Sequence, residues 1–138
     1  MGVDEAVTDR LVAGLGFRHA TSADEILTLL RRALANQSAP LGCLATPADR
    51  ADAPAIRAVA GALGVPLVAV AADAMIAVDA RVLTRSARIA VTRGVGSVAE
   101  DAALAVAGAA ATLILPRIAS AGATCALALA RESVTQAP

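Results

Sequence analysis

The fold is decided by the stretch Gly94-Val95-Gly96-Ser97-Val98-Ala99-Glu100, in which two glycines lead into a Ser-x-x-Glu capping box. In such a box the serine hydroxyl accepts a hydrogen bond from the backbone N–H of the glutamate. The glutamate carboxylate in turn accepts one from the backbone N–H of the serine. An apolar run at residues 102–106 follows. The sequence therefore predicts a helix that begins after Ser97 and ends near Gly108, a typical residue beyond a helix C-terminus.

The start of this helix also predicts an anion-binding site. Its remaining N–H groups and the positive end of the helix dipole face outward, and Arg93 precedes the first glycine. A similar loop, Gly14-Leu15-Gly16-Phe17-Arg18-His19, lies near the N-terminus and runs into a second box that begins at Ser22 and ends at Glu25. We expect these two glycine loops to converge.

Alternating strands and helices extend outward from these loops. Short apolar runs predict strands at residues 11–15, 41–45, 67–71, 112–115 and 124–130. A helical period predicts helices at residues 22–34, at residues 54–63 with Gly64 as the stop, and at residues 73–78 with Asp73 as the cap. Residues 79–92, in or beside which four arginines lie, predict a surface loop, and a turn at residues 120–122 makes the last two strands a hairpin.

This order predicts an α/β fold: a single three-layer α/β/α domain over residues 1–138, with a mostly parallel sheet of about five strands and a C-terminal antiparallel hairpin. Ligands gather beyond the carboxyl ends of strands in such sheets. The first loop, Thr46 after the second strand and the helix start at residues 94–100 are therefore expected to share one rim.

Composition excludes several classes of function. The chain is 57% hydrophobic, has one Phe and no Tyr or Trp, and has a formal net charge of zero, which argues against nucleic-acid binding. Every basic side chain is Arg, so neither a Schiff-base lysine nor a P-loop lysine is present. The charge-free apolar windows at residues 58–72 and 102–116 have 15 residues each, short of a membrane span, and the N-terminus is acidic, so we expect a soluble cytoplasmic protein.

Cofactor and metal motifs are weak. The first loop lacks the third glycine of a dinucleotide fingerprint, and Cys43 and Cys125 stand singly in apolar runs, so we expect buried thiols, no metal and no cofactor. His19 is the sole imidazole, and two roles stay open for it: a surface residue, or a ligand contact and proton carrier. Ser97 is read as a helix cap, while Arg18 and Arg93 are either anion contacts or solvated.

The residues also carry a resemblance. The first loop with Thr21-Ser22, Leu44-Ala45-Thr46 followed by Arg50 and Asp52, residues 94–100, and residues 124–128 together resemble the family formed by CobE and the C-terminal domain of CbiG. This family belongs to cobalamin biosynthesis, and the resemblance implies an α/β domain. Longer CbiG proteins open a lactone ring on a cobalt-precorrin with loss of acetaldehyde. This chain is expected to be the stand-alone form.

Three positions depart from the family pattern. The family usually has Lys where Arg50 and Arg117 stand, and Glu where Ala53 stands. Positive charge survives at the first two positions. The missing Glu removes a general acid or base from that loop, which argues against hydrolase chemistry.

The leading hypothesis is a protein that binds a precorrin or cobalt-precorrin tetrapyrrole, as a binder or carrier, and passes it to a pathway enzyme. Its expected ligand-binding residues are Gly14, Gly16, Phe17, Arg18, His19, Thr46, Arg93, Gly94, Gly96, Ser97 and Glu100. No catalytic residue is assigned beyond the candidate His19. Two alternatives stay open: a hydrolase acting on the same intermediate, and an interaction subunit for a pathway methyltransferase.

Overall fold

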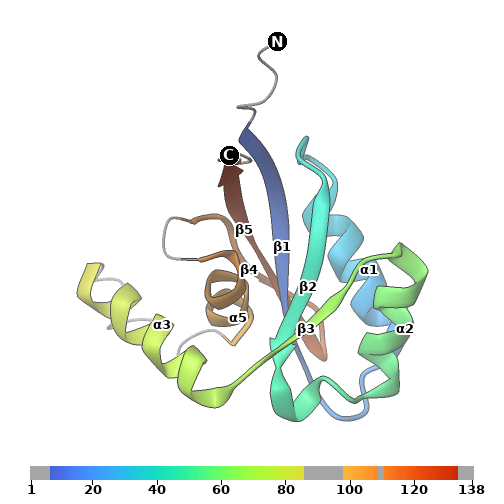
Figure 1. The fold of residues 1–138 in the computed structure, drawn as a ribbon. Coiled ribbons are helices and arrows are strands. Elements are labelled where there is room, and N and C mark those ends of the chain that lie inside the picture. Colours follow the sequence, from blue (N-terminus) through green and yellow to red (C-terminus); the bar gives the residue numbers. More distant parts are fainter. Residues whose placement is uncertain (1–6, 86–97, 109–110, 134–138) are drawn as a thin grey trace.

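The computed structural model describes residues 7–85, 98–108 and 111–133, without the side chains of residues 7, 8, 80–85 and 131–133 (Figure 1). Its strands are β1 (Val7–Phe17), β2 (Leu41–Pro47), β3 (Leu67–Val70), β4 (Thr112–Ala119) and β5 (Ala123–Ser133). Its helices are α1 (Ala23–Leu34), the short 3-10 helix η2 (Ala48–Arg50), α2 (Pro54–Leu63), α3 (Ala72–Arg85) and α5 (Val98–Ala107).

The five strands form one mixed sheet in the order β3-β2-β1-β5-β4. The pairs β1/β2 and β2/β3 are parallel, whereas β5 runs antiparallel to both β1 and β4. The expected strand number and the C-terminal hairpin are confirmed, but half of the strand pairs are antiparallel, so the sheet is less parallel than expected. The reason is that β5 inserts beside β1 along its whole length and separates β4 from the parallel strands.

Helices cover both faces of the sheet, which gives the three layers (Figure 1). On β1 the odd-numbered Leu11, Ala13 and Leu15 join the core beneath α1 and α2. Val12 points to the other face, into a second core cluster with residues of α5 and with Val78 of α3. This alternation follows from the two-residue period of a strand, so a continuous apolar run supplies both cores.

Local capping places the ends of two helices where the sequence predicts them. Ser22 caps α1, and its Oγ accepts a hydrogen bond from the backbone N–H of Glu25 at 3.1 Å. Pro54 occupies the first turn of α2, and Gly64 ends that helix with a left-handed φ of 68°.

The predictions of a short helix at residues 73–78 and of a loop at residues 79–85 are wrong. The helix α3 runs from Ala72 to Arg85, so Asp73 lies in its first turn rather than at its cap. Arginine is a good helix former, and the arginines of this segment therefore did not indicate a loop. Packing of Val78 against α5 supplies the apolar contact that the weak pattern concealed. Residues 86–92 lie outside the described residues.

The strands β1, β2, β4 and β5 are longer than their apolar runs. β1 begins at Val7, in a polar segment that pairs with the end of β5. β4 continues through Pro116 to Ala119, and its register with β5 shifts between Leu115 and Ile118. Proline is tolerated there because β4 is an edge strand and needs no N–H on its open side. Among the described residues no helix is long and apolar enough to cross a membrane.

Candidate functional site

The carboxyl ends of β1 and β2 meet the β4–β5 turn at one edge of the sheet, because the antiparallel β5 begins where β1 ends, with Ala123 paired to Phe17. A cavity of about 490 Å³, open to solvent, lies at this edge, and we call it the rim cavity. Its lining comes from β1 and the residue after it, from η2 and the residue before it, and from the first residue of α5. The rest comes from β4, from the β4–β5 turn and from the first two residues of β5. These residues are Gly16, Phe17, Arg18, Pro47, Asp49, Arg50, Val98, Arg117, Ser120, Ala121, Gly122, Ala123 and Thr124.

Three arginines from three different elements surround the rim cavity. Arg18 follows β1, Arg50 ends η2 and Arg117 lies on β4. Arg18 and Arg117 are exposed, while Arg50 is half-buried. The exposed Asp49 is the one acidic side chain among the described residues that line the cavity. The site is therefore basic in a chain whose net charge is zero.

Hydrogen bonds from the first turn of α1 and from the residues between β1 and α1 hold the β4–β5 turn in place. The Glu25 carboxylate accepts from the Ser120 hydroxyl at 2.5 Å and from the Gly122 N–H at 2.6 Å, both to its Oε2. The Thr21 hydroxyl and the Arg18 N–H both donate to the Gly122 carbonyl, at 2.8 and 2.9 Å. The Glu25 carboxylate thus binds the β4–β5 turn and does not accept the Ser22 N–H hydrogen bond that a capping box would provide.

These bonds lower the pKa of Glu25. The Ser120 hydroxyl is the main cause, followed by the Gly122 N–H, and the Arg18 guanidinium lowers the pKa further by its charge, while desolvation opposes them. Donors that bond the ionised form favour it. The turn that forms one wall of the rim cavity is therefore held by a carboxylate that stays ionised at neutral pH.

The first turn of α5 packs on the two glycines of β1. A Cβ on Gly14 would lie 1.9 Å from the Ala99 carbonyl oxygen, and one on Gly16 would lie 2.8 Å from Thr124 Oγ1 and 3.4 Å from Val98 Cγ1. Neither glycine has a positive φ. Their role is thus to let a helix and a neighbouring strand approach closely, and this approach brings Val98 to the cavity.

The residues expected to bind a ligand fall into three groups. Gly16, Phe17 and Arg18 line the rim cavity. Gly14, His19, Thr46 and Glu100 are described but do not line it. Arg93, Gly94, Gly96 and Ser97 lie outside the described residues, and so does the serine half of the capping box.

The second group has other surroundings. Thr46 is fully buried, and its hydroxyl donates to the Leu15 carbonyl at 2.8 Å, which ties β2 to β1. His19 is exposed in the turn after β1. Glu100 Oε2 accepts from the Arg117 N–H at 2.9 Å, so α5 is linked to β4 beside the cavity. The glutamate expected to cap its own helix thus positions the backbone of a cavity arginine.

Several residues that line the rim cavity were not predicted as ligand contacts from the sequence. Asp49, Arg50 and Arg117 were not selected, nor was the hairpin turn at residues 120–122. A signal for two of them was present, because Arg50 and Arg117 stand where the resembling family has Lys. The turn carried no such signal, since its place at the rim depends on β5 pairing with β1.

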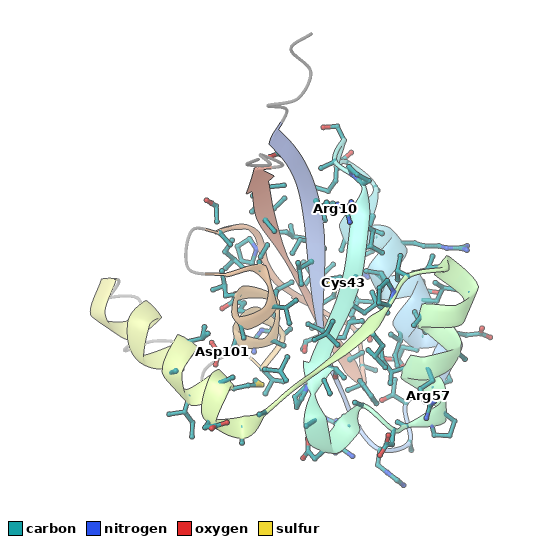
Figure 2. The ribbon with its side chains drawn as sticks, viewed as in Figure 1. Arg10, Cys43, Arg57 and Asp101 are labelled. Atoms are coloured by element: carbon teal, nitrogen blue, oxygen red, sulfur yellow. The ribbon has the colours of Figure 1, made fainter. Side chains whose placement is uncertain are left out.

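Cys43, Cys125 and Asp101 are not among the residues that line the rim cavity. Both cysteines are free; burial raises the pKa of Cys125 to about 12, whereas Cys43 is only half-buried, on β2 near Arg10 of β1 (Figure 2). Asp101, 7% exposed, lies on the side of α5 that faces α3 (Figure 2). In the described part of the chain no group of three or more His, Cys, Asp or Glu side chains is placed to hold a metal ion.

Comparison with known proteins decides the family. The family described as "Cobalamin synthesis G C-terminus" matches residues 11–128. The chain belongs to this family. A protein named CobE from Sinorhizobium sp. is 40% identical over 121 residues, which cover 86% of this chain and 79% of that protein. The resemblance seen in the sequence is thus confirmed, and the chain is a cobalamin-biosynthesis protein.

Two solved structures share the fold. The crystal structure of CobE, a protein from the cobalamin (vitamin B12) biosynthetic pathway, matches with a TM-score of 0.71 and 30% identity, covering 88% of this chain and 90% of that one. The cobalamin biosynthesis protein chiG from Agrobacterium tumefaciens str. C58 has the same TM-score at 34% identity, covering 86% of this chain and 96% of its own.

Proposed function

We propose that this protein binds a precorrin-type tetrapyrrole intermediate of cobalamin biosynthesis in the rim cavity and acts as a binder or carrier. The observation that carries the proposal is the set of three arginines, Arg18, Arg50 and Arg117, around one cavity at the carboxyl edge of the sheet. Corrin precursors carry acetate and propionate side chains around the ring, and guanidinium groups bind carboxylates with two parallel hydrogen bonds. Membership of a cobalamin-synthesis family supplies the substrate class.

The lining supports binding rather than catalysis. Among the described residues of the cavity wall, Asp49 is the one carboxylate and none is a histidine or a cysteine. Ala53 stands where the family usually has Glu, and His19 is exposed without lining the cavity. General acid or base catalysis needs a titratable group within hydrogen-bond reach of the reacting atom, and the wall supplies few.

The test uses uroporphyrin, a stable tetrapyrrole with an acetate and a propionate on each pyrrole, followed by its absorbance and fluorescence on titration with protein. Arg50→Gln is expected to weaken binding about tenfold because Arg50 is half-buried, and Arg18→Gln and Arg117→Gln about threefold each because exposed ion pairs are screened. The matched control is Arg31→Gln on the exposed face of α1, which should change nothing. Equal affinity in all four variants and in the parent would refute the proposal.

A second experiment separates carrier from enzyme. The protein is incubated with a precorrin-type intermediate and passed through a gel-filtration column, and the pigment in the protein fraction is analysed by mass. A pigment that elutes with the protein and keeps its mass supports the carrier role. A new product formed by the parent protein would make it an enzyme.

A further inference from the structure

We infer that the rim cavity holds the tetrapyrrole by one edge, through two neighbouring carboxylate side chains, and leaves the rest of the macrocycle in solvent. This inference rests on the proposed function and adds to it the binding geometry and the number of acidic groups that are recognised.

The size of the cavity is the first reason. Pockets that enclose most of a drug-sized ligand have volumes of roughly 300–1,000 Å³. The rim cavity, at about 490 Å³, lies in the lower half of that range. A macrocycle of four pyrrole-derived rings with acidic arms on each is larger than a drug-sized ligand. The cavity that the described residues form can therefore take part of the periphery and is too small to enclose the ring.

The charge of the wall is the second reason. The described lining residues include three arginines and one aspartate, a formal net charge of +2, which two carboxylates neutralise. Directly behind the wall, the carboxylates of Glu25 and Glu100 accept backbone N–H groups and add negative charge. A third or fourth ligand carboxylate drawn into the cavity would be desolvated without a cationic partner, which is costly. The remaining acidic arms of a precorrin are thus kept in water.

The backbone of the wall is the third reason, because it places the three arginines on separate segments of the chain and hydrogen bonds hold two of these segments. The Arg18 N–H donates to the Gly122 carbonyl at 2.9 Å, and the Arg117 N–H donates to Glu100 Oε2 at 2.9 Å. Arg50 comes from a third element, η2, across the carboxyl edge of the sheet. Anchors on several elements suit two adjacent acidic arms rather than one. Arg18 and Arg117 lie at the mouth, since their side chains are exposed.

The experiment compares the binding of three porphyrin probes to the protein: uroporphyrin, with eight carboxylates; deuteroporphyrin, with two propionates on adjacent pyrroles; and a porphyrin whose acidic groups are all converted to neutral amides. The inference predicts that the first two bind with affinities within about tenfold of each other, and that the amide probe does not bind measurably. Arg50→Gln should weaken both acidic probes by the same factor, because both use the same two contacts.

Solvent access to the bound ring supplies an independent measurement. The chain has no Trp or Tyr, so porphyrin fluorescence is read without protein emission. Acrylamide, a neutral quencher, should quench bound uroporphyrin almost as well as free uroporphyrin if the ring protrudes. Strong protection of the bound ring, or loss of deuteroporphyrin binding while uroporphyrin still binds, overturns the edge-on geometry and leaves the proposed function standing. Failure of uroporphyrin itself to bind overturns both.

Discussion

Gly14→Ala is expected to lower the free energy of unfolding by about 3 kcal/mol, the upper end of the range for an overpacked core. The added Cβ would lie 1.9 Å from the Ala99 carbonyl oxygen, 2.7 Å from the Ala103 nitrogen and 2.9 Å from the Ala99 carbonyl carbon. All three are backbone atoms of α5, so no flexible side chain can move aside. To reach an ordinary contact of 3.4 Å the helix must shift by about 1.5 Å, away from a core in which Ala99 and Ala103 are fully buried.

The assay is urea and thermal unfolding followed by circular dichroism, since the chain has no Trp or Tyr to report by fluorescence. For a domain of this size the expected loss lowers the melting temperature by roughly 10 °C. The matched control is Gly61→Ala on α2, an exposed helical position with nothing within 4 Å of the added Cβ. That change should stabilise the protein by about 0.5–1 kcal/mol through helix propensity.

Two results would refute this reasoning. One is a Gly14→Ala protein within about 0.5 kcal/mol of the parent, the spread of ordinary surface substitutions, because α5 would then not be packed against β1 as described. The other is equal destabilisation by Gly61→Ala, because the loss would then come from any added methyl group rather than from the close approach. A displaced α5 should also weaken tetrapyrrole binding, since Val98 at its start lines the rim cavity.

Substitutions at three further positions test individual hydrogen bonds of the fold. Thr46→Val leaves the buried Leu15 carbonyl without its 2.8 Å donor and should cost about 1–2 kcal/mol in urea unfolding, whereas no loss would mean that the bond contributes nothing. Ser22→Ala removes the cap of α1 and should cost about 1 kcal/mol by the same assay, with Ser22→Asp restoring it; an unaltered midpoint for the alanine variant would contradict the cap. Because the Ser120 hydroxyl and its neighbours lower the folded pKa of Glu25 below its ordinary 4.5, its contribution to stability is full above that pH and is lost as the pH falls through the folded pKa. Unfolding measured in steps from pH 7 to about pH 3 should therefore show a smaller acid loss for Glu25→Gln than for the parent, and parallel profiles would exclude this carboxylate as a source of the pH dependence.

The sequence predicted the local features of the fold well. The caps at Ser22 and Gly64 and the proline that opens α2 depend on the hydrogen bonds and backbone angles of adjacent residues, so a pattern of a few letters specifies them. The α/β class and the closing hairpin also followed, because the order of apolar periods reflects which elements must bury a face. Boundaries were less accurate, as the longer α3 and β4 illustrate, since packing and strand pairing extend elements beyond their own apolar runs.

The sequence by itself therefore determined the family, the element order and the presence of arginines after β1 and β2. Only the tertiary structure decided which of those arginines share a cavity. Arg117 is 67 residues beyond Arg50, and it reaches the rim because β5 turns back along β1 and carries β4 with it. Gly14 stays a predicted ligand contact, and the structure shows that it admits α5, because the distance from a glycine to a distant helix is set by the packing of the whole sheet. A rim assembled from strand ends depends on long-range pairing, which no local pattern of residues encodes.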